Sequence, residues 1–114
     1  MPRLPGDLEK LILFALLHLG EEAYGASIQR EIVARTGREV AVGALYTGLQ
    51  RLERRGWIRG RMGEPTPERG GRRKKHYRLQ PTGARALSEA YDALRRMAAG
   101  TESRLGTAAE AADA

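Results

Sequence analysis

Apolar side chains recur every three or four residues over the first twenty positions, as they do on one face of a helix. The repeat covers residues 7–19 and predicts an amphipathic helix that is stopped by Gly20. Asp7 is the expected N-cap, because its short acidic side chain can accept a hydrogen bond from a free backbone N–H. The apolar positions of this helix are Leu8, Leu11, Ile12, Ala15, Leu16 and Leu19.

Two further apolar stripes follow at the same spacing. Tyr24, Ile28 and Ile32 predict a second helix of about twelve residues that Gly37 closes. A third helix is predicted to run toward Gly56. Its apolar stripe consists of Val42, Leu45, Leu49 and Leu52.

The face of the third helix opposite this stripe is polar, with side chains three and four positions apart. Such a strip can hydrogen-bond base edges or phosphates along one groove of a duplex. An ordinary amphipathic surface helix shows the same spacing, so the pattern alone leaves both interpretations open. The strip consists of Thr47, Gln50, Arg51 and Arg54, with Tyr46 at its border.

A hairpin is predicted after the third helix. Apolar and basic residues alternate loosely over 57–62 and again over 74–79, and the segment between them is rich in Gly, Pro and charged residues. That segment is too long and too polar for a protein core, so it is expected to project into solvent. We call the hairpin over residues 57–79 the wing.

Pro81 suits the first turn of a fourth helix, which carries a further apolar stripe. The first three helices already fill the core of a small domain. The stripe is therefore expected to meet a second copy of the chain, the alternative being that it folds back on its own domain. Residues 100–114 show little apolar periodicity and are expected to form a disordered tail. The predicted dimerisation residues are Leu87, Ala90, Tyr91, Leu94 and Met97.

Length and composition limit the possible classes of protein. A chain of 114 residues that is 41% hydrophobic can close one modest core, and its few aromatic residues favour a mainly α fold. It contains no cysteine, which excludes disulfides, thiolate zinc sites and a cysteine nucleophile. A reducing cytoplasm is the expected compartment. The longest apolar run is too short to cross a membrane.

Positive charge is concentrated in one part of the chain. Residues 51–78 contain eleven Lys or Arg against three glutamates, a local charge of +8 within a total of +6, so the remainder carries −2. This segregation favours an anionic partner such as nucleic acid.

No catalytic or metal-binding constellation is recognisable. His18 has no second ligand near it, and His76 sits among basic residues that would repel a cation. The serines lack the Gly-x-Ser-x-Gly context, and neither histidine completes a triad. We therefore expect neither an enzyme nor a cofactor.

Several short motifs together resemble the PadR family of winged helix-turn-helix regulators, over roughly residues 4–98. Each motif is weak alone, but the combination and its order are specific. The matching pieces are Leu4-Pro-Gly-Asp-Leu8, Tyr24-Gly25, Gly43-Ala-Leu-Tyr46 with Leu49, Arg51-Leu-Glu53 with Gly56, and Tyr77-Arg-Leu79 with Gly83.

The resemblance implies a dimeric repressor that inserts its third helix into the major groove of duplex DNA and lays its wing along the backbone or the minor groove. Residues 1–80 would form the DNA-binding domain, 81–99 the dimerisation helix and 100–114 the tail. Gln50 and Arg51 are the best candidates for base reading, beside Tyr46, Thr47 and Arg54. The wing residues expected to meet phosphates are Arg69, Arg72, Arg73, Lys74 and Lys75.

Other features of the chain modify these expectations. Trp57 and Tyr77 are expected to pack the wing onto the core, the alternative being that they stack on bases. Ala41 and Val42 stand where the family often has a capping Ser or Thr, so that cap and its phosphate contact are missing. Gln80 likewise replaces the usual Thr before the last helix.

A small-molecule effector pocket is a further hypothesis, based on three large side chains near the dimer face, with core packing as the alternative. These are Phe14, Tyr91 and Met97.

Two other functions use the same features. An RNA-binding or ribosome-associated protein could employ the basic wing, but it would need neither a two-fold axis nor a recognition helix. An adaptor with the same fold could bind protein alone, since a fold does not determine a function. The motifs in the third helix favour DNA over RNA, and the basic wing argues against the adaptor.

Overall fold

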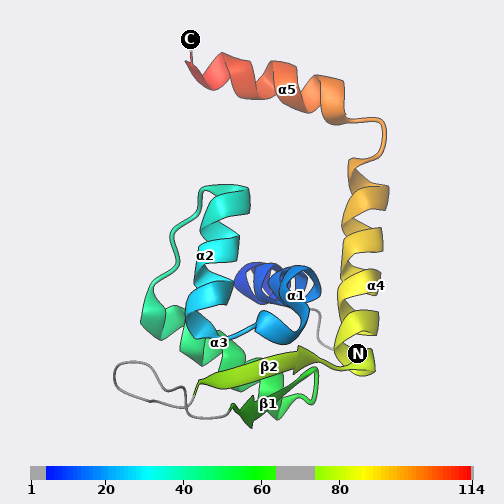
Figure 1. Cartoon of the computed structure of the whole chain (residues 1–114). Helices are drawn as coiled ribbons and strands as arrows, with labels where there is room; N and C mark the ends of the chain where they lie inside the picture. Colours follow the sequence, from blue (N-terminus) through cyan, green and yellow to red (C-terminus); the bar gives the residue numbers. More distant parts are fainter. Residues whose placement is uncertain (1–4, 64–73, 114) are drawn as a thin grey trace.

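Three helices that pack against one another form the core of the protein (Figure 1). They are α1 (Asp7–Leu19), α2 (Gly25–Thr36) and α3 (Val42–Arg54), each close to its predicted range. The computed structural model describes residues 5–63 and 74–113. Burial of each large apolar side chain contributes about 1.5–3 kcal/mol. The largest fully buried side chains are Ile12, Leu13, Ile28, Leu45, Leu49, Leu52 and Ile58.

The start of α1 differs in detail from the prediction. Gly6 is the N-cap and Asp7 is the first helical residue, so the assignment of Asp7 as the cap is wrong. Glu9 supplies the capping side chain instead, because its Oε1 accepts a hydrogen bond of 2.8 Å from the backbone N–H of Gly6. The other carboxylate oxygen of this buried residue accepts a bond of 2.9 Å from Arg55. One buried carboxylate thus joins the start of α1 to the end of α3.

Val42 also differs from its predicted role in the apolar stripe of α3. Its side chain is 56% exposed, whereas Leu45, Leu49 and Leu52 are buried as predicted. Residues 41–44 are all exposed. The first turn of α3 is therefore exposed to solvent. The buried stripe therefore starts one turn later than the sequence pattern indicates.

The wing is an antiparallel hairpin of β1 (Ile58–Met62) and β2 (Lys75–Leu79), with Ile58 opposite Leu79 and Met62 opposite Lys75. Residues 64–73 lie outside the described part. Successive side chains of a strand point to opposite faces of the sheet. Here Ile58 and Tyr77 face the core. The hairpin prediction is therefore confirmed.

A single residue pair extends this hairpin toward the helices. Tyr24 forms an isolated antiparallel bridge with His76, and the backbone N–H of Tyr77 donates a hydrogen bond of 2.8 Å to the carbonyl of Ala23. A short 3-10 helix, η1 (Gly20–Glu22), leads into this bridge. A one-residue bridge has no alternating pattern, so the sequence could not reveal it. It fixes the wing to the start of α2.

The chain continues through α4 (Pro81–Ala98), α5 (Glu102–Glu110) and η2 (Ala111–Asp113). Helix α4 stands beside α1, and α5 extends away from the rest of the protein (Figure 1). The prediction of a disordered tail is wrong for the helical part of residues 100–114. Alanine and glutamate favour helix even where no apolar face is buried, and no residue of α5 is buried.

Gly83 allows α4 to approach the backbone at the start of β1. A Cβ atom at this position would lie 2.2 Å from the carbonyl oxygen of Trp57, far inside van der Waals contact. The same oxygen accepts a hydrogen bond of 2.9 Å from the backbone N–H of Gln80. Thr82 donates another of 2.9 Å to the carbonyl of Gly56. The first turn of α4 is thus attached to the turn that follows α3.

Replacement of this glycine tests how strongly the fold depends on the close approach. Gly83→Ala is expected to lower the free energy of unfolding by about 1–3 kcal/mol, because the methyl group meets rigid backbone. Denaturant unfolding followed by circular dichroism measures the change. Gly106→Ala on α5 is the control, since no atom lies within 4 Å of its Cβ position. Equal unfolding midpoints for the two variants would contradict the assignment.

Candidate nucleic-acid interface

Helix α3 presents its predicted polar strip to solvent. Thr47, Gln50, Arg51 and Arg54 are exposed, and Tyr46 is 45% exposed. They lie opposite the buried leucines of the same helix. Within the described residues, the ion pairs of the protein include neither Arg51 nor Arg54. The strip is therefore available to a ligand.

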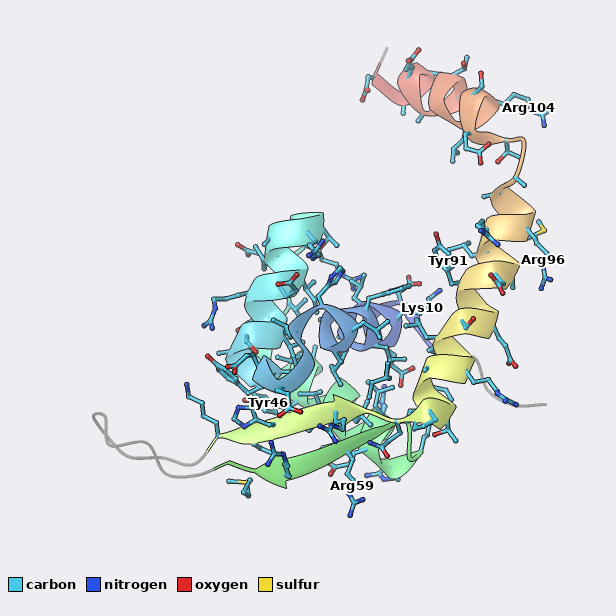
Figure 2. The ribbon with its side chains drawn as sticks, turned by 45° about the vertical axis from the view of Figure 1, so that its right-hand side comes forward. Lys10, Tyr46, Arg59, Tyr91, Arg96 and Arg104 are labelled. Carbon is cyan, nitrogen blue, oxygen red and sulfur yellow. The ribbon has the colours of Figure 1, made fainter. Side chains whose placement is uncertain are left out.

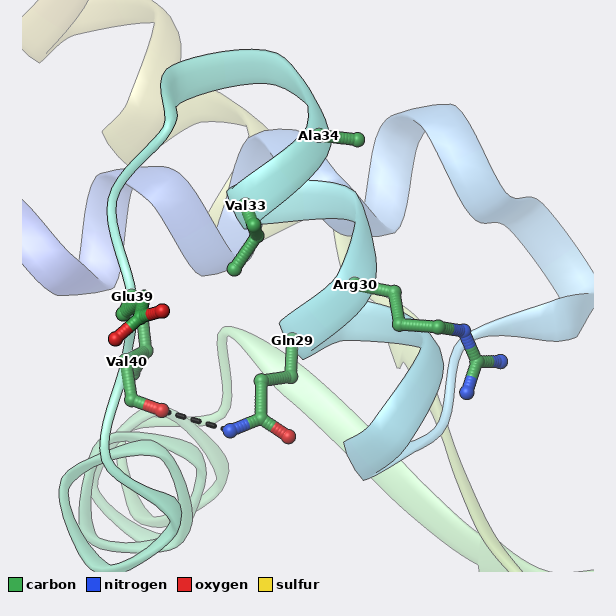
Figure 3. A pocket seen from close by; sticks show the side chains of 6 residues that line it. All are labelled: Gln29, Arg30, Val33, Ala34, Glu39 and Val40. Atoms are coloured by element: carbon green, nitrogen blue, oxygen red, sulfur yellow. Dashed lines mark hydrogen bonds between the residues drawn. The ribbon is translucent and has the colours of Figure 1, made fainter.

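The start of α3 is held by α2. Gln29 donates a hydrogen bond of 2.7 Å from Nε2 to the carbonyl oxygen of the buried Val40 (Figure 3). This bond lies in a hollow between α2 and the segment that leads into α3. Ala41 caps α3 without a side-chain hydrogen bond, as its sequence predicted. The position of the helix thus depends on Gln29 rather than on a cap.

Tyr46 lies at the border between α3 and the start of α2. A Cβ atom on Gly25 would lie 2.2 Å from the Tyr46 hydroxyl oxygen, so the phenol rests on the first residue of α2. In Figure 2 it lies between the start of α2 and β2. This contact explains why glycine follows Tyr24. It also means that part of the Tyr46 side chain packs within the protein.

The two wing lysines have different environments. Lys75 forms an ion pair of 3.0 Å with Glu53, whose other oxygen accepts a hydrogen bond of 3.2 Å from the backbone of Gly60. The hydrogen bond that Lys75 donates to Glu53 raises the pKa of Lys75, although burial opposes this shift. Lys74 instead lies over the ring of Tyr24, with Nζ 4.3 Å from the ring centroid. Arg69, Arg72 and Arg73 lie outside the described residues.

The outer face of the wing carries arginines for which the sequence predicted no individual role. Arg59 lies directly opposite Arg78, and Arg61 is on the same face. Glu21 of η1 pairs with Arg78 at 2.5 Å and with Arg61 at 3.7 Å. Figure 2 shows Arg59 pointing away from the protein. The alternation of the strand was the signal that could have identified this face.

Trp57 and Tyr77 pack the wing onto the core, as predicted. Tyr77 is 6% exposed, and Trp57 is partly buried against the core cluster. Burial raises the pKa of Tyr77. The guanidinium of Arg55 lies 5.0 Å from the centre of the Trp57 ring, a cation–π distance. These aromatic side chains support the wing.

The predicted dimerisation stripe of α4 divides into two parts. Leu87 and Ala90 are buried within the chain itself. Tyr91, Leu94 and Met97 are 50%, 59% and 81% exposed. The first part thus follows the alternative in which α4 folds back on its own domain, whereas the second part is largely exposed to solvent.

Two of the three predicted effector residues come together. The rings of Phe14 and Tyr91 meet edge to face with centroids 5.9 Å apart. They line a hollow of about 330 Å³ between α1 and α4, whereas Met97 does not. Figure 2 shows Tyr91 on the side of α4 that faces Lys10. The remaining lining residues are Asp7, Lys10, Leu11, Arg38 and Leu94.

Residues 5–63 and 74–113 contain neither a cluster of metal-ligating side chains nor a helix suited to span a membrane. In this part of the chain, no cluster of three or more His, Cys, Asp or Glu residues could hold a metal ion. None of the helices described there is both long and apolar enough to cross a membrane.

Three helices, an exposed polar strip on the third and a basic hairpin define a winged helix-turn-helix DNA-binding protein. Residues 13–89 match the family model described as the transcriptional regulator PadR-like family. The chain belongs to this family. Its members are DNA-binding transcription regulators rather than enzymes.

Solved structures show the same fold. A PadR family transcription regulator from hypervirulent Clostridium difficile is 23% identical, with a TM-score of 0.68 over 88% of this chain and 99% of that one. A PadR-like transcription factor from Bacteroides fragilis is 26% identical, with a TM-score of 0.67 over 82% and 84%. A PadR family regulator from Eggerthella lenta is 25% identical, with a TM-score of 0.64 over 87% and 86%. A comparison with curated proteins gave no match.

The ion pair between Glu53 and Lys75 predicts an effect on DNA binding. Glu53→Gln is expected to raise the affinity for duplex DNA, because Lys75 becomes free to meet a phosphate. The plot of the logarithm of the DNA-binding constant against the logarithm of the salt concentration should steepen by up to about 0.9, the slope expected for one phosphate contact. Fluorescence anisotropy over a range of salt concentrations measures both quantities. Glu31→Gln removes the same charge from α2 and frees Arg35 instead. Equal effects of the two variants would refute a role for Lys75.

Proposed function

We propose that this chain is a homodimeric repressor that binds a palindromic DNA operator through α3 and the wing. The observation that carries the proposal is the exposed polar strip of α3, which lies opposite the buried stripe of the same helix. An α-helix fits the major groove of B-form DNA, where each base pair presents a distinct pattern of donors and acceptors. A dimer bound across a promoter would exclude RNA polymerase from the same DNA.

Within the strip, Gln50 and Arg51 are our candidates for base reading. Glutamine can form two hydrogen bonds with adenine, and arginine can form two with guanine. Thr47 and Arg54 lie along the same face and would fix the helix on the backbone or on neighbouring bases. Phosphate contacts from the wing add affinity without sequence preference.

Replacement of Arg51 tests the base-reading role. Arg51→Ala is expected to weaken operator binding by about 1–3 kcal/mol and to relax preference at one base pair of each half-site. Competition binding against single-base variants of the operator measures both effects. Arg96→Ala is the control, because Arg96 is exposed on α4 (Figure 2). Weakened binding with unchanged base preference would assign Arg51 to the backbone instead.

The exposed end of α4 supports the proposed dimer. Tyr91, Leu94 and Met97 present large apolar side chains to solvent. Exposed apolar patches of this kind commonly mark interaction sites. Most dimers have two-fold symmetry, so the same patch can meet itself. A two-fold dimer would place two copies of α3 on half-sites about one helical turn apart, roughly 34 Å.

A charged side chain introduced at Leu94 tests whether this apolar patch forms the dimer interface. Leu94→Glu is expected to give a monomer, because association would then bury two unpaired carboxylates. Affinity for a palindrome should fall by about 10²–10⁴-fold through loss of two-site binding. Light scattering measures the mass, and anisotropy the affinity. Glu89→Lys, at an exposed position of the same helix, should remain dimeric. A dimeric Leu94→Glu protein would rule out this interface.

We further propose that a small planar aromatic compound binds the hollow between α1 and α4 and releases the operator. The volume of about 330 Å³ lies in the range of small-molecule pockets, and the Phe14 and Tyr91 rings offer aromatic surfaces. Binding and DNA affinity are reciprocally linked, so a compound that weakens DNA binding must bind more weakly to the DNA complex.

Calorimetry with a panel of planar phenolic and cationic compounds tests this hollow. At least one compound should bind the wild-type chain, and Phe14→Ala should weaken that binding. The same compound should lower operator affinity. If none of the panel binds, the effector proposal is wrong, while the DNA-binding proposal is unaffected.

Selection from a random duplex pool at near-physiological salt tests the main function, with the mass of the protein measured alongside. An enriched palindrome and a dimeric mass support it, and a reporter under that palindrome then tests repression. Salt-sensitive binding with no enriched motif would contradict it and favour the RNA-binding alternative. No nucleic-acid binding would favour the adaptor.

A further inference from the structure

Tyr24 gathers positive charge at the junction between α2 and the wing. Its hydroxyl oxygen accepts a hydrogen bond of 3.1 Å from Nη2 of Arg30. Nζ of Lys74 lies 4.3 Å from the centre of its ring, and the His76 ring meets it edge to face at 5.5 Å. Two cations from different elements thus share one phenol. The hydrogen bond from Arg30 lowers the pKa of Tyr24, and Lys74 lowers it further.

The two cations have no carboxylate partner among the described residues. The ion pairs found there involve other side chains, such as Arg61 and Arg78 with Glu21 or Lys75 with Glu53. Arg30 and Lys74 are both exposed. Their mutual repulsion is therefore offset only by the electron-rich ring and by solvent. A bound anion would remove this repulsion.

The cluster adjoins both the border of the α3 strip and the wing. Tyr46, at the border of the α3 strip, rests on Gly25, which is the neighbour of Tyr24. Tyr24 in turn forms the backbone bridge to His76 of the wing. A continuous surface therefore runs from α3 through the start of α2 to the wing. When a helix occupies a major groove, phosphates line both edges of that groove.

Arg30 lines the same hollow as Gln29 and Val40, but its guanidinium points away from these two residues (Figure 3). It reaches back to the Tyr24 hydroxyl, one residue before the start of α2. The exposed guanidinium therefore lies beside the junction with the wing. The periodicity of α2 gave no reason to single out Arg30, because its role depends on a contact with Tyr24 and on the bridge to the wing.

We propose that Arg30, Lys74 and the Tyr24 hydroxyl form a binding site for one phosphate of the DNA backbone, so that α2 contributes to DNA binding. The proposal rests on the DNA-binding function. The Tyr24 oxygen accepts from Arg30, which leaves the hydroxyl proton free to donate to a phosphate oxygen. The guanidinium and the ammonium supply charge-assisted hydrogen bonds to the same group.

Three substitutions separate this role from a structural one. Arg30→Gln and Lys74→Gln should each lower duplex affinity about tenfold and reduce the slope of log K against log salt by about 0.9. Tyr24→Phe keeps the ring and the charges. It should lower affinity several-fold while leaving the salt slope unchanged. All three should unfold at nearly the wild-type midpoint, because the side chains concerned lie at the surface.

Arg35→Gln is the matched control, since Arg35 is an exposed arginine of the same helix that pairs with Glu31. The probe is the duplex enriched by selection, together with a scrambled duplex of equal length. A loss that is equal on both duplexes supports a phosphate contact. If Arg30→Gln behaves like Arg35→Gln while the wild-type chain binds DNA, this site is refuted and the DNA-binding function remains. If the wild-type chain binds neither duplex, the function itself fails.

Discussion

Burial of the leucine stripe of α3 is the constraint on which the rest of the structure depends. Leu45, Leu49 and Leu52 lie in the core between α1 and α2, and Gly48 allows Ile12 to approach the helix closely. A helix that buries one face must present the opposite face to solvent, so the position of Gln50 and Arg51 follows from the packing. Loss of one buried leucine would cost about 2–5 kcal/mol, a large part of the stability of a small domain. Stability and the binding surface are therefore properties of the same helix.

The distribution of carboxylates decides which cations can reach DNA. Glu9 holds Arg55 in a partly buried pair, Glu53 holds Lys75, and Glu21 lies between two arginines of the wing. These pairs connect elements that are distant in the sequence. The strip on α3 and the pair on Tyr24 are left without such partners in the described part of the chain. The net charge does not distinguish cations that are paired with carboxylates from cations that are free, because it counts both equally.

Most of the fold follows from the sequence because its elements have strong local signals. The apolar repeats and the glycines at positions 20 and 37 located α1 and α2, and the residue alternation located the wing. Contacts between distant residues have no such signal. The cap from Glu9, the bridge at Tyr24 and the pairing of Lys75 with Glu53 each join side chains that the sequence pattern treats separately. The strip on α3 could be predicted for the same reason as its helix, whereas the surroundings of Lys74 and Lys75 could not.

Hydroxyl-radical footprinting of the complex with the selected duplex tests whether a two-fold dimer binds the operator, because it reports every backbone position that the protein covers. A two-fold dimer should give two equivalent sets of protected sugars, related by a two-fold axis and centred about one helical turn apart, roughly 34 Å. Each set should extend past the groove occupied by α3 to the phosphates at its edge. A single set of protections without two-fold symmetry, or protection that is uniform along the duplex, would contradict it.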